Sequence, residues 1–282
     1  MMKDVGRIAV TTSARGGRHQ VDLGIRLAHE LGAPFITRAG RSLQSLADAY
    51  SEDGRGELEA FMVVEADRIS VVRLADAGRR SAELFFHPGM ALSRIRRLKQ
   101  GGVDQMVEAM GISSGDHVLD CTIGLASDAI VSSWVVGSRG RVVGVEVSPV
   151  LSIITREGLT SYTEADPDVL DAMRHIEVVA SDHLDYLRSC ADKSFDVVSF
   201  DPMFREPVTS SAGIAPIRPW ACHTPLSVEA LSEACRVARR RVVVKDRADG
   251  DELDKLGVGH KIGAKKSRQE YGVIFVEGER WD

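Results

Sequence analysis

The sequence predicts an α/β protein with a doubly wound, mostly parallel seven-stranded sheet and a small N-terminal α/β domain. Three observations predict this fold. From about residue 112 onward, short apolar runs alternate with helical patterns, which is typical of parallel strands joined by helices. Several of these runs end in an acidic residue. A separate strand and helix pattern precedes them, and 282 residues are enough for two domains, although one large domain is also compatible with this length.

The composition indicates a globular protein without a membrane helix. Hydrophobic residues make up 44% of the chain and charged residues 27%, and no apolar run approaches the ~20 residues that a membrane helix needs. The N-terminus lacks the pattern of a signal peptide, so a cytoplasmic location is expected. The four cysteines form neither a C-x-x-C pair nor a cluster with zinc spacing, so neither a metal site nor a disulfide framework is predicted.

The net charge of −5 argues against a protein that coats nucleic acid indiscriminately, but it leaves a specific RNA partner open. Three basic clusters could contact such a partner, although a solvated face explains each one alone more simply. The clusters are Arg94 with Arg96, Arg97 and Lys99, then Arg236 with Arg239, Arg240 and Arg241, then Lys261 with Lys265, Lys266 and Arg268.

The strand and helix pattern of residues 1–85 predicts a small α+β domain with a possible role in substrate recognition. A strand over 6–12 leads into a polar loop that contains glycine, and apolar spacing predicts helices over 21–31 and 42–50. The runs 61–64 and 69–74 predict a hairpin. Residues 86–282 are expected to form the second domain.

In the second domain, two helical stretches near 89–99 and 102–110 precede the alternating pattern. Five strands are predicted, over 117–122, 141–147, 176–181, 195–201 and 241–245. The helices between them are predicted near 127–136, 149–162, 182–190 and 227–239. The final runs, 260–265 and 271–277, predict an antiparallel hairpin at the sheet edge.

The first two strands of this domain end in residues that suit a nucleoside. In doubly wound sheets, ligands bind beyond the carboxyl ends of the strands, where the strand order reverses. Asp120 lies in the first strand, and Gly124 permits a tight turn before the helix that begins at Ser127. Glu146 ends the second strand, where an acid can accept two hydrogen bonds from a ribose diol.

The charge beside this turn favours a cationic ligand over a pyrophosphate. A dinucleotide site would favour the G-x-G-x-x-G pattern, whereas Asp120 and Asp128 would repel a pyrophosphate. S-adenosyl-L-methionine carries a sulfonium, an ammonium and a ribose, which suit these carboxylates. Ser181 and Asp182 end the third strand and could accept the adenine amino group. Each acid alone could also be an ordinary strand-end or helix-cap residue.

The fourth strand ends in Asp201-Pro202-Met203-Phe204, which suits a flat base that carries an amino group. The Asp201 carboxylate and the Pro202 carbonyl can accept the hydrogens of the amine, and Phe204 can stack on the base. Alternatively, Phe204 packs the loop as a core residue. We predict Asp201, Pro202 and Phe204 as catalytic residues that act mainly by placing the amine for methyl transfer.

In their order along the chain, these segments resemble the class I S-adenosylmethionine-dependent methyltransferases. The similarity covers roughly residues 85–275 and is greatest to the bacterial small-subunit (16S) ribosomal RNA guanine-N2 methyltransferase family, with its D-P-M-F-P and V-V-V-K motifs. The matching segments are 118–129, 145–149, 180–182, 201–204 and 241–245. The resemblance implies a Rossmann-like methyltransferase fold and methylation of the exocyclic N2 of a guanine in ribosomal RNA.

The resemblance also implies which residues hold S-adenosyl-L-methionine. They cluster at the strand ends and are Ser127, Asp128, Glu146, Val147, Ser181, Asp182 and Asp201. Asp120, Thr122 and Gly124, at the end of the first strand and in the turn after it, complete the predicted cofactor site. The sequence departs from the family at two positions, because Ala126 replaces the second glycine of the turn and Arg205 replaces the proline after Phe204. The first change should restrict the backbone slightly, and the second leaves the acceptor base open.

Three alternative functions stay open. A methyltransferase for a small molecule or a protein side chain would use the same scaffold, with the loop 205–225 as a lid. A nicotinamide-dependent oxidoreductase is disfavoured by the missing glycine and by the acids at the turn. A non-catalytic RNA-binding module would not need the cofactor site. Lys245, at the end of the fifth strand, could contact an RNA phosphate or extend along the sheet edge.

Overall fold

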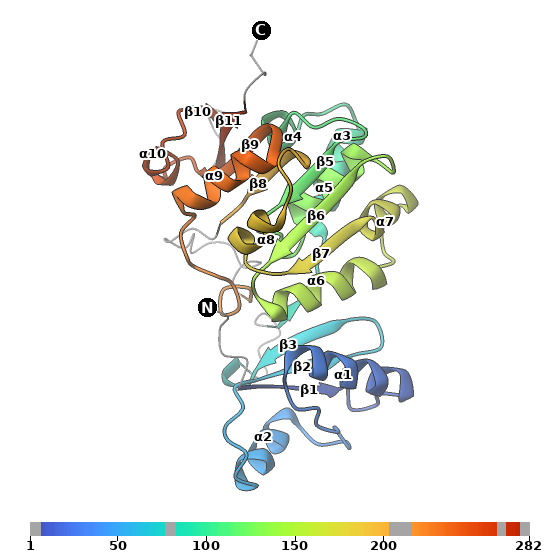
Figure 1. Ribbon diagram of the computed structural model, residues 1–282. Coiled ribbons are helices and arrows are strands. Elements are labelled where there is room, and N and C mark those ends of the chain that lie inside the picture. Colours follow the sequence, from blue (N-terminus) through green and yellow to red (C-terminus); the bar gives the residue numbers. More distant parts are fainter. Residues whose placement is uncertain (1–6, 77–82, 203–215, 264–268, 277–282) are drawn as a thin grey trace. The chain divides into compact units, whose positions relative to one another are not determined.

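The structure is a computed structural model that describes residues 7–76, 83–202, 216–263 and 269–276 (Figure 1). The chain divides into two compact units. The first comprises Met1–His87, Ser148–Tyr162 and Val208–Trp220. The second comprises Pro88–Val147, Thr163–Pro207 and Ala221–Asp282.

The first unit is built on a four-stranded sheet in the order β1-β2-β3-β4. The strands are β1 (Ile8–Thr12), β2 (Ala60–Val64), β3 (Ile69–Arg73) and β4 (Leu84–Phe85). β1 and β2 are parallel, whereas β2 and β3 form the predicted antiparallel hairpin. Every residue of β1 and β2 is buried, as expected for strands that are covered on both faces.

Helices cover both faces of this small sheet. α1 (Arg18–Leu31) packs on β1 and β2, while α2 (Leu43–Glu52) buries Leu46 and Ala47 against Phe61 and Val63 of β2. α6 (Pro149–Ser161) also belongs to this unit, although the chain enters it directly from the strands of the second unit. Arg156 of α6 pairs with Glu30 of α1 at 2.6 Å. A short 3-10 helix, η2 (Leu74–Asp76), follows β3.

The second unit contains a seven-stranded sheet in the order β10-β11-β9-β8-β5-β6-β7. Its parallel strands are β5 (His117–Asp120), β6 (Arg141–Glu146), β7 (Ile176–Ala180), β8 (Phe195–Phe200) and β9 (Ala238–Arg247). β10 (His260–Ile262) and β11 (Gln269–Phe275) form an antiparallel hairpin that pairs with β9. This topology confirms the predicted doubly wound, mostly parallel sheet. The strand order reverses between β5 and β8, which is where such sheets bind ligands.

Helices of the second unit form two groups. α3 (Gly89–Lys99) and α7 (Pro167–Arg174) pack against α5 (Ser127–Val136), and α4 (Gln105–Met110) packs on β9 and β11. On the other face lie α8 (His183–Ser189) and α9 (Val228–Val237), side by side in Figure 1, together with α10 (Glu252–Lys255). Leu187, Ala230 and Leu253 of this group join one core with Val198 and Val242 of the sheet.

Within the described residues, the sequence pattern missed the helices α7 and α10 and the two-residue strand β4, and it misplaced the start of β9. α10 is only four residues long, too short for an apolar period. α7 has eight residues and buries Val169, Ala172 and Met173, a spacing that could have been recognised. The strand β9 begins at Ala238, inside the predicted helix over 227–239, because Ala238 pairs with Phe195 of β8. No helix among the described residues is long and apolar enough to cross a membrane. Within the same residues, no group of three or more His, Cys, Asp or Glu side chains could hold a metal ion.

Candidate active site

The loop that follows β5 joins the carboxyl ends of neighbouring strands. In the register of the sheet, Asp120 lies between Gly144 of β6 and Ser199 of β8. Two residues later, the Thr122 hydroxyl accepts a hydrogen bond from the backbone N of Asp201, at 2.6 Å. The predicted cofactor residues after β5 are therefore held directly against the predicted catalytic residue after β8.

Glu146, at the end of β6, is bound to the turn that precedes α5. Its side chain is buried, and its Oε2 accepts a hydrogen bond from the backbone N of Gly124 at 3.1 Å. Gly124 has a φ of +50°, a left-handed conformation that glycine adopts readily. Ala126, which stands where the resembling family has a glycine, also takes this conformation, with a φ of 62°. The left-handed conformation costs about 1–2 kcal/mol for a residue with a Cβ.

Asp120 is buried at the end of β5, with 5% of its surface exposed. Its Oδ1 accepts a hydrogen bond from the backbone N of Thr122 at 3.0 Å, and no other described residue donates to its carboxylate. Burial, and secondarily the nearby Asp128 carboxylate, raises the pKa of Asp120 to about 7. A cation bound beside Asp120 would stabilise the ionised form, so the site favours a positively charged ligand.

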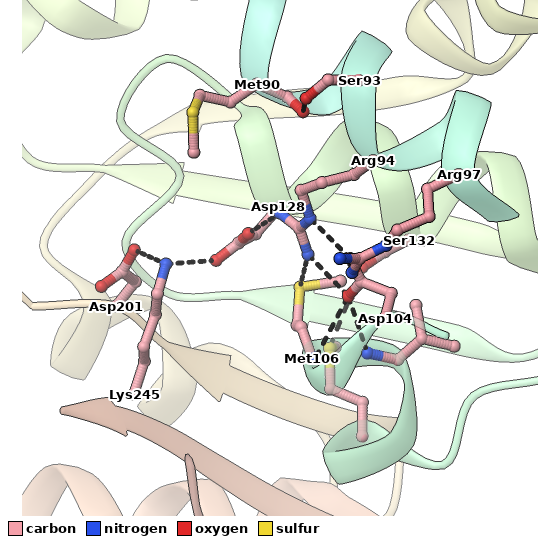
Figure 2. Close-up of polar contacts among 12 residues, drawn as sticks. Met90, Ser93, Arg94, Arg97, Asp104, Met106, Asp128, Ser132, Asp201 and Lys245 are labelled. Atoms are coloured by element: carbon pink, nitrogen blue, oxygen red, sulfur yellow. Dashed lines mark hydrogen bonds and ion pairs between the residues drawn. The ribbon is translucent and has the colours of Figure 1, made fainter. Parts of the chain in front are cut away.

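Asp128, in the first turn of α5, is held between two cations from other elements. Arg94 of α3 donates to Oδ1, and Nζ of Lys245 of β9 lies 3.2 Å from Oδ2 (Figure 2). Burial alone would raise the pKa of Asp128, but Lys245 and Arg94 lower it to about 2. Asp128 is therefore ionised at neutral pH, and both of its oxygens already have cationic partners.

Lys245 also binds the predicted catalytic acid. Its Nζ lies 2.6 Å from Oδ2 of Asp201, and only 11% of the lysine side chain is exposed. Burial opposes its positive charge, but the Asp128 and Asp201 carboxylates outweigh this effect and raise the pKa of Lys245. The prediction that Lys245 contacts an RNA phosphate or extends along the sheet edge is wrong, because its ammonium pairs with two carboxylates inside the site.

Arg94 extends this network to α4. Its Nε and Nη2 lie 2.8 and 2.9 Å from the two carboxylate oxygens of Asp104. Asp104 in turn caps α4, because its Oδ1 accepts from the backbone N of Met106 and Val107. Charges of alternating sign thus run from one helix to the end of the sheet, in the order Asp104, Arg94, Asp128, Lys245 and Asp201 (Figure 2).

A small pocket lies where these side chains meet. Asp120, Asp128, Asp201 and Lys245 line it together with apolar side chains that include Met106. Tyr271 of β11 also lines it, and burial raises the pKa of this phenol to about 12. Three of the predicted acids therefore share one pocket, and Glu146 lies one hydrogen bond away from the adjoining turn.

The other predicted site residues lie around the same strand ends. Ser127 begins α5 and Val147 follows Glu146. The backbone N of Ser181 donates to the Glu146 carbonyl at 3.0 Å. Asp182 uses Oδ1 to cap α8, which is the structural alternative considered for the acids, so its contact with adenine remains a prediction. Pro202 directly follows Asp201, whereas Phe204 and Arg205 lie outside the described residues.

The basic clusters that could have contacted RNA are mostly neutralised by carboxylates. Among the ion pairs that these basic residues form in the described part of the chain are Arg94–Asp104, Arg97–Asp104, Lys99–Asp166, Arg236–Glu233, Arg239–Asp196, Arg240–Asp116 and Lys261–Asp254. Lys265, Lys266 and Arg268 lie outside the described residues. The clusters therefore stabilise the second unit more than they offer free charge to a polyanion.

Sequence reasoning missed the roles of Arg94, Asp104 and Lys245. The contact of Lys245 follows from the parallel register of β9 and β8, which the structure shows by placing Val244 opposite Phe200. The next residues, Lys245 and Asp201, must then be neighbours. Arg94 carries no comparable signal, because its contact depends on how α3 packs against α5.

Comparisons with known proteins show the family to which this chain belongs. The family model described as "Putative SAM-dependent methyltransferase" matches residues 46–273. Uncharacterized protein YpiP of Bacillus subtilis (strain 168) is 37% identical over 265 residues, which are 94% of this chain and 98% of that protein. Ribosomal RNA small subunit methyltransferase J of Cellvibrio japonicus (strain Ueda107) is 31% identical over 188 residues, 62% of this chain and 69% of that protein.

A solved structure shares the fold over nearly the whole chain. The SAM-dependent methyltransferase NGO1261 from Neisseria gonorrhoeae has a TM-score of 0.65 and 17% sequence identity. The match covers 96% of this chain and 97% of that chain.

Proposed function

Because this chain belongs to the family of S-adenosylmethionine-dependent methyltransferases, we propose that it methylates the exocyclic N2 of a guanine in ribosomal RNA. The observation that carries the proposal is the contact between Thr122 and the backbone of Asp201. It holds the Asp201-Pro202 step beside the acids of the cofactor site. A carboxylate and a carbonyl at this place suit an aromatic amine.

S-adenosylmethionine is the cofactor, and it supplies a methyl group that is activated by a positively charged sulfur. The residues at the strand ends fit this ligand. Asp120 has a carboxylate oxygen without a hydrogen bond from the described residues, and we expect it to attract the positive charge of the ligand. Glu146, beside the turn at Gly124, is expected to accept from the ribose hydroxyls. Asp128 acts on this site through Lys245 and Arg94, since both of its oxygens are paired.

The acceptor amine is a weak nucleophile because its lone pair is conjugated with the base. Catalysis therefore depends mainly on orientation, which contributes on the order of 7–11 kcal/mol in favourable systems. Asp201 and the Pro202 carbonyl would hold the hydrogens of the amine, and Phe204 would stack on the ring. A base inside a helix would first have to flip out of its stack, at a cost of about a few kcal/mol.

We propose residues 1–85 as the substrate-recognition domain, through contacts with the RNA backbone. Arg15 and Arg18 surround the turn between β1 and α1, and Arg38 and Arg41 occupy the loop that contacts this turn. Arg15, Arg18 and Arg41 are exposed. Within the described part of the chain, no carboxylate forms an ion pair with Arg15 or Arg41, so both could bind phosphate.

The test is methyl transfer from labelled S-adenosylmethionine to 16S ribosomal RNA taken from cells that lack this protein. Mass mapping of the product should find N2-methylguanosine at one position, and Asp201→Asn should lower the rate at least about 100-fold. Asp192→Asn is the matched control, because Asp192 is an exposed acid of the same unit. Labelling of a small molecule or a protein in place of RNA, or full activity of Asp201→Asn, would contradict the proposal.

A further inference from the structure

Lys245 is a buried cation between two acids that come from different elements. β9 and β8 are parallel, and Val244 lies opposite Phe200, so Lys245 within β9 lies beside Asp201, the residue that follows β8. The Lys245 Nζ lies 2.6 Å from Oδ2 of Asp201 and 3.2 Å from Oδ2 of Asp128. Two anions from α5 and from the end of β8 thus fix the position of this ammonium.

The support behind Lys245 is rigid. Asp128 is anchored by Arg94, and Arg94 is anchored by both carboxylate oxygens of Asp104, the N-cap of α4. A planar guanidinium that binds a carboxylate through two nitrogens has little rotational freedom. Each member of the chain therefore restricts the next, and Lys245 has little freedom to leave Asp201.

The two oxygens of Asp201 have different surroundings. Oδ2 is bound by Lys245, while no described residue donates a hydrogen bond to Oδ1. The side chain is 37% exposed, so a ligand can reach it. The Thr122 hydroxyl holds the backbone N of the same residue. Lys245 thus fixes Oδ2 of the carboxylate, and Oδ1 can accept a hydrogen bond from a ligand.

We infer that Lys245 is a positioning residue for methyl transfer, which holds Oδ2 of Asp201 and leaves Oδ1 to accept a hydrogen from the substrate amine. This inference rests on the proposed role of Asp201. As the nitrogen gains the methyl group, the bonding electrons return to sulfur, and the nitrogen must release one proton. An ionised Asp201 can stabilise the positive nitrogen and accept that proton at Oδ1.

The same contact opposes the protonation of Asp201, which lies among several other charged groups. Burial raises the pKa of Asp201, and the Asp128 carboxylate raises it further, while Lys245 and the more distant Arg94 oppose this increase. Asp120 and Tyr271 also line the pocket. Because the Lys245 ammonium lies closest to Asp201 among the cations of the described residues, its removal should leave Asp201 protonated, and unable to accept at Oδ1, up to a higher pH.

NMR titration of the aspartate carboxyl carbons tests this directly and needs no RNA. In Lys245→Met, the pKa of Asp201 should rise by about 1–3 units. Lys245→Arg retains the charge and should keep the pKa near that of the wild type. Lys255→Met is the matched control, because Lys255 pairs with Asp251 in α10, at an exposed site. An unchanged Asp201 pKa in Lys245→Met would overturn the inference.

Kinetics then separate a positioning role from a structural one. In Lys245→Met, the acid limb of the plot of kcat against pH should move to higher pH by the same amount as the pKa of Asp201. In Lys245→Arg, the acid limb should stay at its wild-type position. A loss of activity at all pH values, with an unmoved limb, would show that Lys245 only stabilises the fold. If ribosomal RNA is not methylated but the Asp201 pKa still shifts, the proposed substrate is wrong and the pairing inference stands.

A measurement on the wild-type protein covers the case in which Lys245→Met does not fold. With 15N-labelled lysine, the Lys245 ammonium should give a signal that shifts in the same titration as the Asp201 carboxyl carbon. A lysine signal that does not respond to this titration would contradict the pairing.

Discussion

Two turns of this protein join a parallel strand to a helix through a loop that contains glycine, and they carry opposite charge. In the first unit, Arg15 and Arg18 follow β1, and the first turn of α1 has no acidic residue. In the second unit, Asp120 ends β5, and Asp128 lies in the first turn of α5. A helix N-terminus by itself favours an anion. Side-chain charge therefore makes only the turn after β1 suitable for phosphate.

The two turns also differ in how their charges are compensated. Asp128 is buried between Arg94 and Lys245, so its charge is part of the fold. Arg15 is exposed, and it forms no ion pair in the part of the chain that the structure describes. The comparison teaches that strand–turn–helix geometry alone does not select a ligand. The side chains around the turn and their tertiary partners make that selection.

The largest effect is expected when the buried charge of the second turn is removed. Asp128→Asn leaves Arg94 and Lys245 facing each other without their shared carboxylate, and the free energy of unfolding should fall by about 3–5 kcal/mol. Urea denaturation measures this change. Asp168→Asn is the control, because Asp168 forms an exposed ion pair with Lys99. Its free energy of unfolding should fall by less than about 1 kcal/mol.

The stabilisation by Asp128 also depends on pH. Its pKa in the folded protein is about 2, below the ordinary value of 3.8, so the stabilisation is present above about pH 4 and is lost as the pH falls towards 2. If Asp128→Asn and Asp168→Asn lowered the free energy of unfolding equally, the ion pairs of Asp128 with Arg94 and Lys245 would not stabilise this turn.

A second prediction concerns the acid that holds the turn after β5. Glu146→Gln should weaken binding of S-adenosylmethionine by about 10- to 100-fold, because hydrogen bonds to a charged group contribute about 1.5–3 kcal/mol. Isothermal titration calorimetry measures the affinity. Glu177→Gln on β7 is the control, since this exposed acid pairs with Arg141. Similar affinities for both variants would exclude Glu146 from the cofactor site.

A third prediction uses the raised pKa of Asp120, which is about 7. If the ionised form binds the cationic cofactor, the affinity should increase roughly eightfold between pH 6 and pH 7.5, as the carboxyl loses its proton. Calorimetry at both pH values measures this increase. In Asp120→Asn the increase should disappear, and a wild-type affinity that does not change with pH would argue against Asp120 as a cofactor contact.

The smallest effect is expected at the turn after β1. Arg15→Ala should lower the slope of log affinity against log salt for 16S ribosomal RNA by about 1, and leave the affinity for S-adenosylmethionine unchanged. This slope change corresponds to about a fourfold change in the ratio of RNA affinities at 50 and 200 mM salt. Arg239→Ala should have no such effect, because Asp196 already neutralises Arg239. If the wild type, Arg15→Ala and Arg239→Ala had the same slope of log affinity against log salt, the turn after β1 would not contact the RNA.

Much of the fold could be predicted from sequence patterns. Parallel strands covered on both faces are continuously apolar, as at Val142 to Val145, and this pattern located the five parallel strands of the second unit. The comparisons confirmed the methyltransferase family. Short segments such as α10 escaped prediction, because four residues do not complete an apolar period.

The sequence by itself predicted the strands in their order along the chain and the acids at their ends, because apolar periodicity and turn chemistry are local properties. The sequence also predicted that Asp120, Glu146 and Asp201 would meet, because the carboxyl ends of parallel strands lie at one edge of a sheet, and the structure places Asp120 and Asp201 in one pocket. Only the tertiary structure decided that Arg94 and Lys245 neutralise Asp128 and Asp201. Arg94, Asp128, Asp201 and Lys245 are far apart in the chain, and their pairing depends on how α3 packs and on β9 lying beside β8. Electrostatic partners are chosen by distance in space, which no local pattern contains.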